Sequence, residues 1–136
     1  MDESSDEYVE LANRYATYSK ADLLRELGRI ARPANYKDEP SDEVFEGEGK
    51  IIWRRYRKKL AVFICKNRGE PASETVETFL SAGARAFIHE MVRTILGQGV
   101  IPAITAAMAA ALAGLLYDEL KSGIDAFCNL YYFEDQ

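Results

Sequence analysis

Apolar residues recur every three or four positions through most of this chain, which is the spacing of amphipathic α-helices. Near the amino terminus, two serines are each followed by an acid at capping-box spacing, ahead of such an apolar series. These signals predict helices over about residues 5–18 and 20–32, and Pro33 ends the second.

The strongest periodic patterns lie in the middle of the chain. Residues 50–67 place aromatic and aliphatic side chains on one side and basic side chains elsewhere, which predicts a third helix. Apolar positions from Val76 to Leu96 then keep a spacing near 3.6, which predicts one long fourth helix of about 24 residues. An alanine-rich fifth helix follows the break at residues 97–99, and a sixth is expected over about 118–132. Only residues 60–65 also fit a short buried strand on composition.

This pattern predicts an all-α fold, a compact bundle of five or six helices around an alanine-rich central hydrophobic helix. A chain of 136 residues fits a single domain, here residues 1–136. Residues 33–49 hold prolines, glycines and many acids with few apolar residues. We therefore expect them to form a mobile acidic connector, although a short helical turn at residues 41–45 also fits the sequence.

Residues 94–117 form a run of 24 residues without a charge. Such a run is long enough to cross a bilayer, and it also suits a helix buried in protein. Few of its residues are large and aliphatic, which makes membrane insertion marginal and favours the buried helix. Small residues on one side of this helix predict a close helix-packing or oligomer interface. They are Ala103, Ala106, Ala107, Ala110 and Gly114.

The net charge of −5 divides unevenly along the chain. Residues 1–48 carry −7, residues 49–96 carry +6 and residues 97–136 carry −4. The basic middle segment either attracts the acidic segments on folding or binds an anionic partner or lipid. Its candidate contact residues are Arg54, Arg55, Arg57, Lys58 and Lys59.

The aromatic residues among these bases bear on nucleic-acid binding. Trp53 and Tyr56 share helical spacing with Leu60, which places them in the core rather than on a stacking surface. Together with the acidic net charge, this placement makes nucleic acid a disfavoured partner.

Candidate chemistry elsewhere is sparse. His89 lies four residues from both Arg85 and Arg93, so the three form a weak candidate site for a phosphate or carboxylate on one helix flank. A solvated helix flank is the better explanation of these three residues. No spacing typical of a metal site, a phosphate loop or a nucleophile with its base stands out, so we expect neither an enzyme nor a cofactor. Cys65 and Cys128 have apolar neighbours, which predicts buried, reduced thiols.

Two functional hypotheses follow. The first is a small helical protein–protein interaction or regulatory module. Its partner is a protein, and a second copy of the chain is one candidate. The second is a membrane-active protein that inserts residues 94–117 and anchors the basic helix at 50–67 on an anionic membrane surface. The acidic amino terminus lacks the pattern of a signal peptide, which favours the cytoplasm, with membrane association as the alternative.

Overall fold

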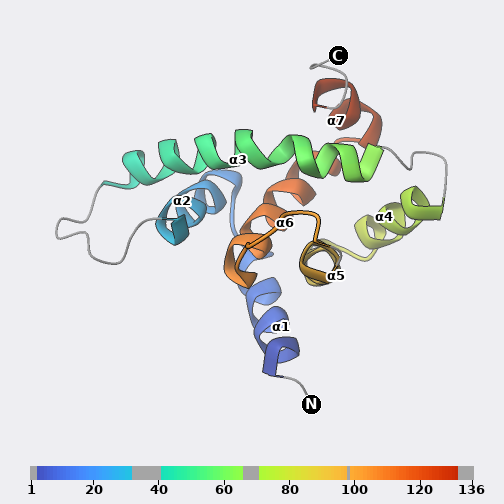
Figure 1. Ribbon diagram of the computed structural model, residues 1–136, viewed down its shortest axis with the longest axis horizontal. Coiled ribbons are helices and arrows are strands. Elements are labelled where there is room, and N and C mark those ends of the chain that lie inside the picture. The colour runs from blue at the N-terminus through green and yellow to red at the C-terminus, as the bar shows by residue number, and fades with distance from the viewer. Residues whose placement is uncertain (1–2, 32–40, 66–70, 98, 132–136) are drawn as a thin grey trace.

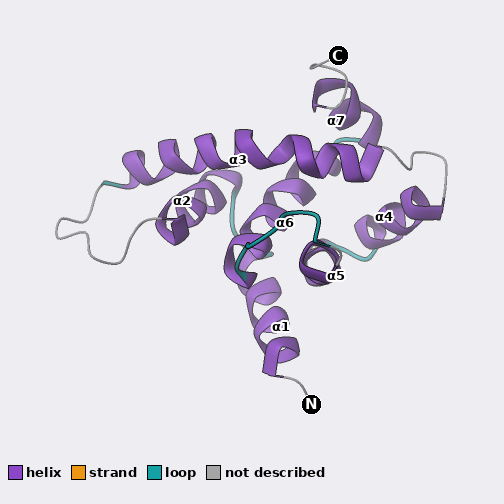
Figure 2. Cartoon of the chain, viewed as in Figure 1, coloured by secondary structure: helices purple, strands orange, loops and turns teal. Residues whose placement is uncertain are grey.

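The computed structural model describes residues 3–31, 41–65, 71–97 and 99–131, and the chain is all-α over these residues (Figure 2). Seven helices, rather than the five or six expected, occupy the described residues. In chain order they are α1 (Glu3–Tyr15), α2 (Lys20–Ala31), α3 (Asp42–Cys65), α4 (Pro71–Ser81), α5 (Ala84–Gly97), α6 (Ala106–Leu120) and α7 (Ile124–Tyr131) (Figure 1).

Helix α6 has the central position, because it contacts α1, α2, α5 and α7. Its residues 109–116 are all buried, and so is Leu120. Around it, α5 packs against α1 and α4, whereas the first half of the long α3 lies along α2 and its far end reaches α7 (Figure 1). Burial on every side explains why residues 109–116 of α6 are apolar all round rather than amphipathic.

The uncharged run at residues 94–117 is not one helix. Its first four residues complete α5, and α6 begins only at Ala106, where the Thr105 side chain accepts a hydrogen bond from the Met108 amide at 3.2 Å. Between the two helices, Gly99 and Ala103 have positive φ angles of 63° and 58°, which an α-helix does not allow. Within the described residues, no helix is both long enough and apolar enough to cross a membrane.

Two other expected helices are also divided. The single fourth helix is in fact α4 and α5, separated by Gly83 at a φ of 102°. The expected helix at 118–132 begins later, because residues 118–120 complete α6 and Gly123 has a φ of 124°. Glycine has no Cβ atom, so it adopts these angles without strain and lets the chain turn between two helices.

Helix α3 begins eight residues before the expected start at position 50. The Ser41 hydroxyl accepts the Val44 amide at 3.4 Å, and the acids Asp42 and Glu43 occupy the first turn, where the helix dipole favours them. The connector predicted at 33–49 is therefore wrong for residues 42–49, which are helical. Residues 33–40 lie outside the described part of the chain.

Two glycines explain how closely α3 lies against α2. A Cβ atom on Gly28 would meet the Phe45 backbone carbonyl oxygen, and one on Gly49 would meet that of Leu24, both at distances below 2.5 Å. The two backbones thus touch directly at two points, each of which requires a residue without a side chain. This contact fixes α3 on one side and leaves its opposite side outside the core.

A disulfide joins Cys65, at the end of α3, to Cys128 in α7, with the two Cα atoms 5.8 Å apart. Both residues are buried, as expected, but the prediction of reduced thiols is wrong. The pairing was hidden in the sequence because 63 positions separate the two cysteines. Disulfides are typical of oxidising compartments, so this bond gives no support to the expected cytoplasmic location.

Candidate interaction surface

One side of α3 faces away from the core and carries exposed apolar residues. Val44, Ile51 and Val62 are 46%, 57% and 51% exposed. They are 7 and 11 residues apart, which is about two and three helical turns, so they lie on one line along the helix. We call the full line the outward stripe of α3. It consists of Val44, Glu48, Ile51, Arg55, Lys58 and Val62.

The opposite side of α3 is held in the core. Trp53 is only 4% exposed, and its indole Nε1 donates a hydrogen bond to Glu119 Oε1 in α6 at 3.2 Å. Lys20 Nζ lies 3.5 Å from the same carboxylate oxygen, and its positive charge balances the negative charge of Glu119. The expected core position is confirmed for Trp53, whereas Tyr56 is half-buried. An indole held in this way is not free to stack on a nucleic-acid base.

The predicted contact residues of α3 divide into two groups by exposure. Arg54, Arg55 and Lys59 are exposed, whereas Arg57 and Lys58 are half-buried. Lys59 Nζ lies 5.7 Å from the centre of the Tyr56 ring, within the range of a cation–π contact. In the described part of the chain, neither Arg54 nor Arg55 has an ion-pair partner.

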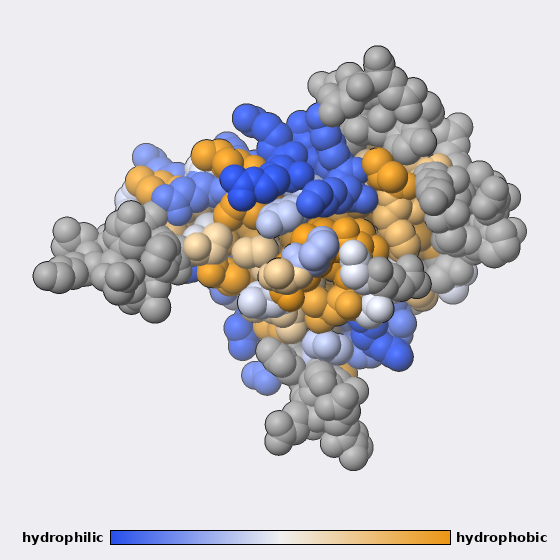
Figure 3. Space-filling model, in the orientation of Figure 1, coloured by the Kyte–Doolittle hydropathy of each residue, from blue (hydrophilic) through white to orange (hydrophobic). Residues whose placement is uncertain are grey.

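The acids at the start of α3 pair with other bases. Arg29 Nη2 lies 2.9 Å from Asp42 Oδ1, and Arg25 Nε lies 3.3 Å from Glu46 Oε1. Both arginines belong to α2, and Lys50 is a further partner of Glu46 at 3.6 Å. The basic cluster at 54–59 is therefore not neutralised by these acids. Arg54 and Arg55 keep their charge on the surface over the second half of α3, where Figure 3 shows a continuous hydrophilic area with hydrophobic residues on either side.

The small-residue side of α6 lies inside the chain. Ala103 does not belong to it, because this residue is exposed in the loop before α6. Ala106 and Ala107 are half-buried at the start of the helix, and Ala110 and Gly114 are buried. A Cβ atom on Gly114 would lie 3.0 Å from Leu23 Cδ2 of α2. The close helix contact is thus between α6 and α2 of one chain, which leaves Ala110 and Gly114 no surface for a second copy.

The candidate anion site on α5 is only partly assembled. Arg85 and His89 line a groove of about 280 Å³ between α5 and α1, together with Val9 and Asn13. Arg93 does not line this groove. Glu90, which is not among the candidate residues, has carboxylate oxygens 3.5 Å from His89 Nδ1 and 3.8 Å from Arg93 Nη1. The Glu90 carboxylate thus already lies beside two of the three proposed anion-binding side chains, His89 and Arg93.

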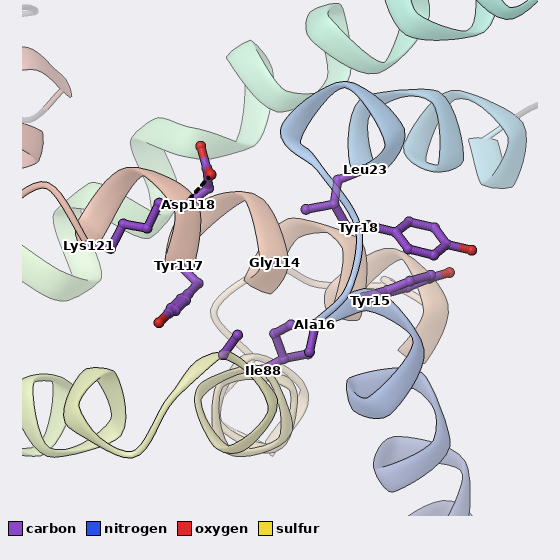
Figure 4. A pocket seen from close by; sticks show the side chains of 10 residues that line it. Tyr15, Ala16, Tyr18, Leu23, Ile88, Gly114, Tyr117, Asp118 and Lys121 are labelled. Carbon is purple, nitrogen blue, oxygen red and sulfur yellow. Dashed lines mark ion pairs between the residues drawn. The ribbon is translucent and has the colours of Figure 1, made fainter.

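A second concavity lies where the α1–α2 turn meets α5 and α6 (Figure 4). Its volume is about 140 Å³, below the roughly 300–1,000 Å³ of ordinary small-molecule sites. The rings of Tyr15 and Tyr18 lie together and direct their hydroxyls away from Gly114. On the far side, Lys121 Nζ pairs with Asp118 at 3.1 Å.

Tyr15 is the titratable group most altered by this environment. Burial, and next the nearby Glu26 carboxylate, raise the pKa of Tyr15 to about 12. Its hydroxyl donates a hydrogen bond to Glu26 Oε1 at 3.4 Å. A phenol with a raised pKa stays protonated near neutral pH, so it does not act there as a base or nucleophile.

The described residues also contain no group of three or more histidine, cysteine or acidic side chains that could hold a metal ion. No family model, curated protein or solved structure matches this chain at a significant level. The assignment of a functional surface therefore depends on geometry alone. Of these surfaces, the outward stripe of α3 is the one that combines exposed apolar side chains with positive charge, and its Arg55 has no ion-pair partner in the described residues.

Proposed function

We propose that the chain is a small helical protein-interaction module that binds a helical partner along the outward stripe of α3. The observation that carries this proposal is the alignment of Val44, Ile51 and Val62, three exposed large apolar side chains on one side of one helix. Single exposed apolar residues are common on protein surfaces, but their alignment offers a row of contacts to an amphipathic helix.

The basic residues beside this row define the chemistry of the partner. Arg54 and Arg55 are exposed beside Ile51 and lack ion-pair partners in the described residues. They favour a partner that carries acidic residues near its contact surface, because long-range attraction between opposite charges increases the rate of association and helps to select the right partner. The apolar contacts supply most of the binding free energy.

Two earlier hypotheses give way to this proposal. An oligomer built on Ala110 and Gly114 of α6 would need surface that α2 already covers. A membrane-active protein that inserts residues 94–117 would need one continuous helix there, and the chain forms two helices and a loop instead. Contact of the basic α3 with an anionic membrane surface is kept as an outcome of the test below.

The test uses a photoactivatable amino acid at one position at a time, in the full chain and in cells. Ile51 and Val62 are the test positions, and Val9 of α1 is the matched control, because it is 46% exposed and lies on another helix. We expect irradiation to give a covalent product with a protein from positions 51 and 62 but not from position 9. Mass spectrometry of the product identifies what was bound.

Three results would contradict the proposal. These are the absence of any product at 51 and 62, products with lipid alone, and equal protein products at all three positions. Lipid products alone would assign the stripe to a membrane surface, where basic amphipathic helices also bind. Equal products everywhere would show contact without a preferred surface.

A further inference from the structure

We infer that the partner of this surface is a second copy of the chain, and that two copies pair antiparallel through their outward stripes. The inference rests on the proposed function, because it names the occupant of the same surface. It is carried by a symmetry in the order of side chains along α3.

The symmetry is centred on position 53, close to the middle of the 24-residue helix. Val44 and Val62 are each nine positions from this centre, Glu48 and Lys58 are each five, and Ile51 and Arg55 are each two. Two antiparallel helices related by a twofold axis at this centre bring such equidistant residues together. Every residue of the stripe thus meets its equidistant counterpart in the second copy.

Each of these contacts is chemically favourable. Val44 meets Val62 of the second copy at both ends of the pairing, so apolar surface is covered there. Glu48 meets Lys58 of the second copy, so a carboxylate faces an ammonium group twice per dimer. Near the centre, Ile51 can pack on the aliphatic part of the Arg55 side chain while the guanidinium stays in water.

The charges also select the orientation. A parallel pair in register would place Glu48 against Glu48, Arg55 against Arg55 and Lys58 against Lys58. Like charges in contact across an interface are unfavourable, so the charge order of the stripe opposes the parallel arrangement. The antiparallel arrangement replaces the like-charge contacts of Glu48 and Lys58 by opposite-charge ones.

The position of α3 leaves room for a second helix. Its inward side is occupied by α2 and by the core, whereas the three apolar residues of the stripe are about half exposed. From Val44 to Val62 the stripe is about 27 Å long, at about 1.5 Å per residue. Glu48 and Lys58 already interact within their own chain, and a second copy would add a contact to each.

The test is a charge-reversal experiment in which the antiparallel pairing predicts loss of dimerisation and then its restoration. The chain of 15.3 kDa is examined by sedimentation equilibrium and light scattering at low ionic strength, where surface charges act most strongly. We expect the unmodified chain to be a dimer. Glu48→Lys alone and Lys58→Glu alone should each weaken dimerisation about tenfold or more, because each places like charges together twice.

Restoration is the decisive measurement. The double variant Glu48→Lys/Lys58→Glu should dimerise like the unmodified chain, because the acid and the base have only exchanged places. An equimolar mixture of the two single variants should also dimerise, because each chain then supplies the charge that the other requires. Glu10→Lys is the control, since this exposed acid lies on α1 and should leave dimerisation unchanged.

Failure of the inference can be told apart from failure of the proposed function. A monomer at all accessible concentrations, or a dimer indifferent to both single reversals, would overturn the antiparallel pairing. So would single variants that are not restored by mixing. In each of these cases, a photoproduct between positions 51 or 62 and a different protein would still support the interaction module.

Discussion

Helix α6 is buried on every side over residues 109–116, whereas α3 is buried along one side only. Both helices carry a marked pattern, since α6 is rich in alanine and leucine and α3 alternates aromatic, aliphatic and basic residues. The alanines of α6 allow neighbouring helices to approach from all directions. The charges of α3 confine contact to one side and leave the apolar residues of the outward stripe about half exposed.

The difference shows that an uncharged segment and an available surface are separate properties. In α6, the absence of charge from residues 106–117 reflects the enclosure of this part of the helix by α1, α2, α5 and α7. In α3, the mixture of Ile51 and Val62 with basic residues leaves a surface that another protein can cover. A substitution in α6 should therefore change stability, whereas one on the stripe should change assembly.

The largest expected effect comes from releasing the end of α3 from α7. Replacing both Cys65 and Cys128 by alanine should lower the free energy of unfolding by about 4 kcal/mol, the chain-entropy value for cysteines 63 positions apart. Denaturant unfolding with and without a reductant measures the loss. The reductant should destabilise the unmodified chain and leave the double variant unchanged. Two free thiols in the denatured, unreduced chain would show that the bond does not form.

A smaller loss is expected from a cavity in α6. Leu112 is fully buried, so Leu112→Ala should lower the free energy of unfolding by about 3 kcal/mol, within the range of about 2–5 kcal/mol for such cavities. The variant should keep the assembly state of the unmodified chain, because this residue does not reach the surface. A loss below about 1 kcal/mol would show that Leu112 is not enclosed.

Hydrophobic periodicity predicted the helical class and the inward side of each long helix well. The first two helices and the core position of Trp53 followed from spacing alone, because burial of one side demands that spacing. The breaks between helices at Gly83 and Gly123 could not be predicted from this spacing. The apolar series from Val76 to Leu96 keeps its phase across Gly83, so the spacing contains no sign of the turn.

The candidate surface was predicted only in its charges. The basic pattern predicts contact at Arg54 and Arg55, but Val44 falls in the segment predicted as a connector, so the aligned apolar residues are not predicted. The available signal was a regular spacing of alternating three and four residues from Val44 to Val62. The glycine contacts between α2 and α3 depend on which backbones cross, and spacing within one helix does not report this.

Two glycines of α3 provide the third way to sharpen the comparison, because Gly49 lies against α2 whereas Gly47 is exposed. Gly49→Ala should lower the free energy of unfolding by about 1–3 kcal/mol, since the new Cβ would collide with the Leu24 carbonyl of α2. Gly47→Ala should raise it by up to about 1 kcal/mol, because nothing lies within 4 Å of its Cβ position and alanine favours the helix. Thermal unfolding of both variants measures the contrast. Equal effects would show that α2 does not touch α3 at Gly49.

The smallest expected effect on stability belongs to Ile51 on the outward stripe. Removing most of a side chain that is 57% exposed creates no cavity, so Ile51→Ala should change the free energy of unfolding of the isolated chain by no more than about 0.5 kcal/mol. The measurement is denaturant unfolding at a protein concentration low enough to keep the chain monomeric. Leu112→Ala is the matched control, because it also truncates a large aliphatic side chain on a helix. If Ile51→Ala cost as much as Leu112→Ala in the monomer, the stripe would be part of the core, and the contrast between α3 and α6 would no longer hold.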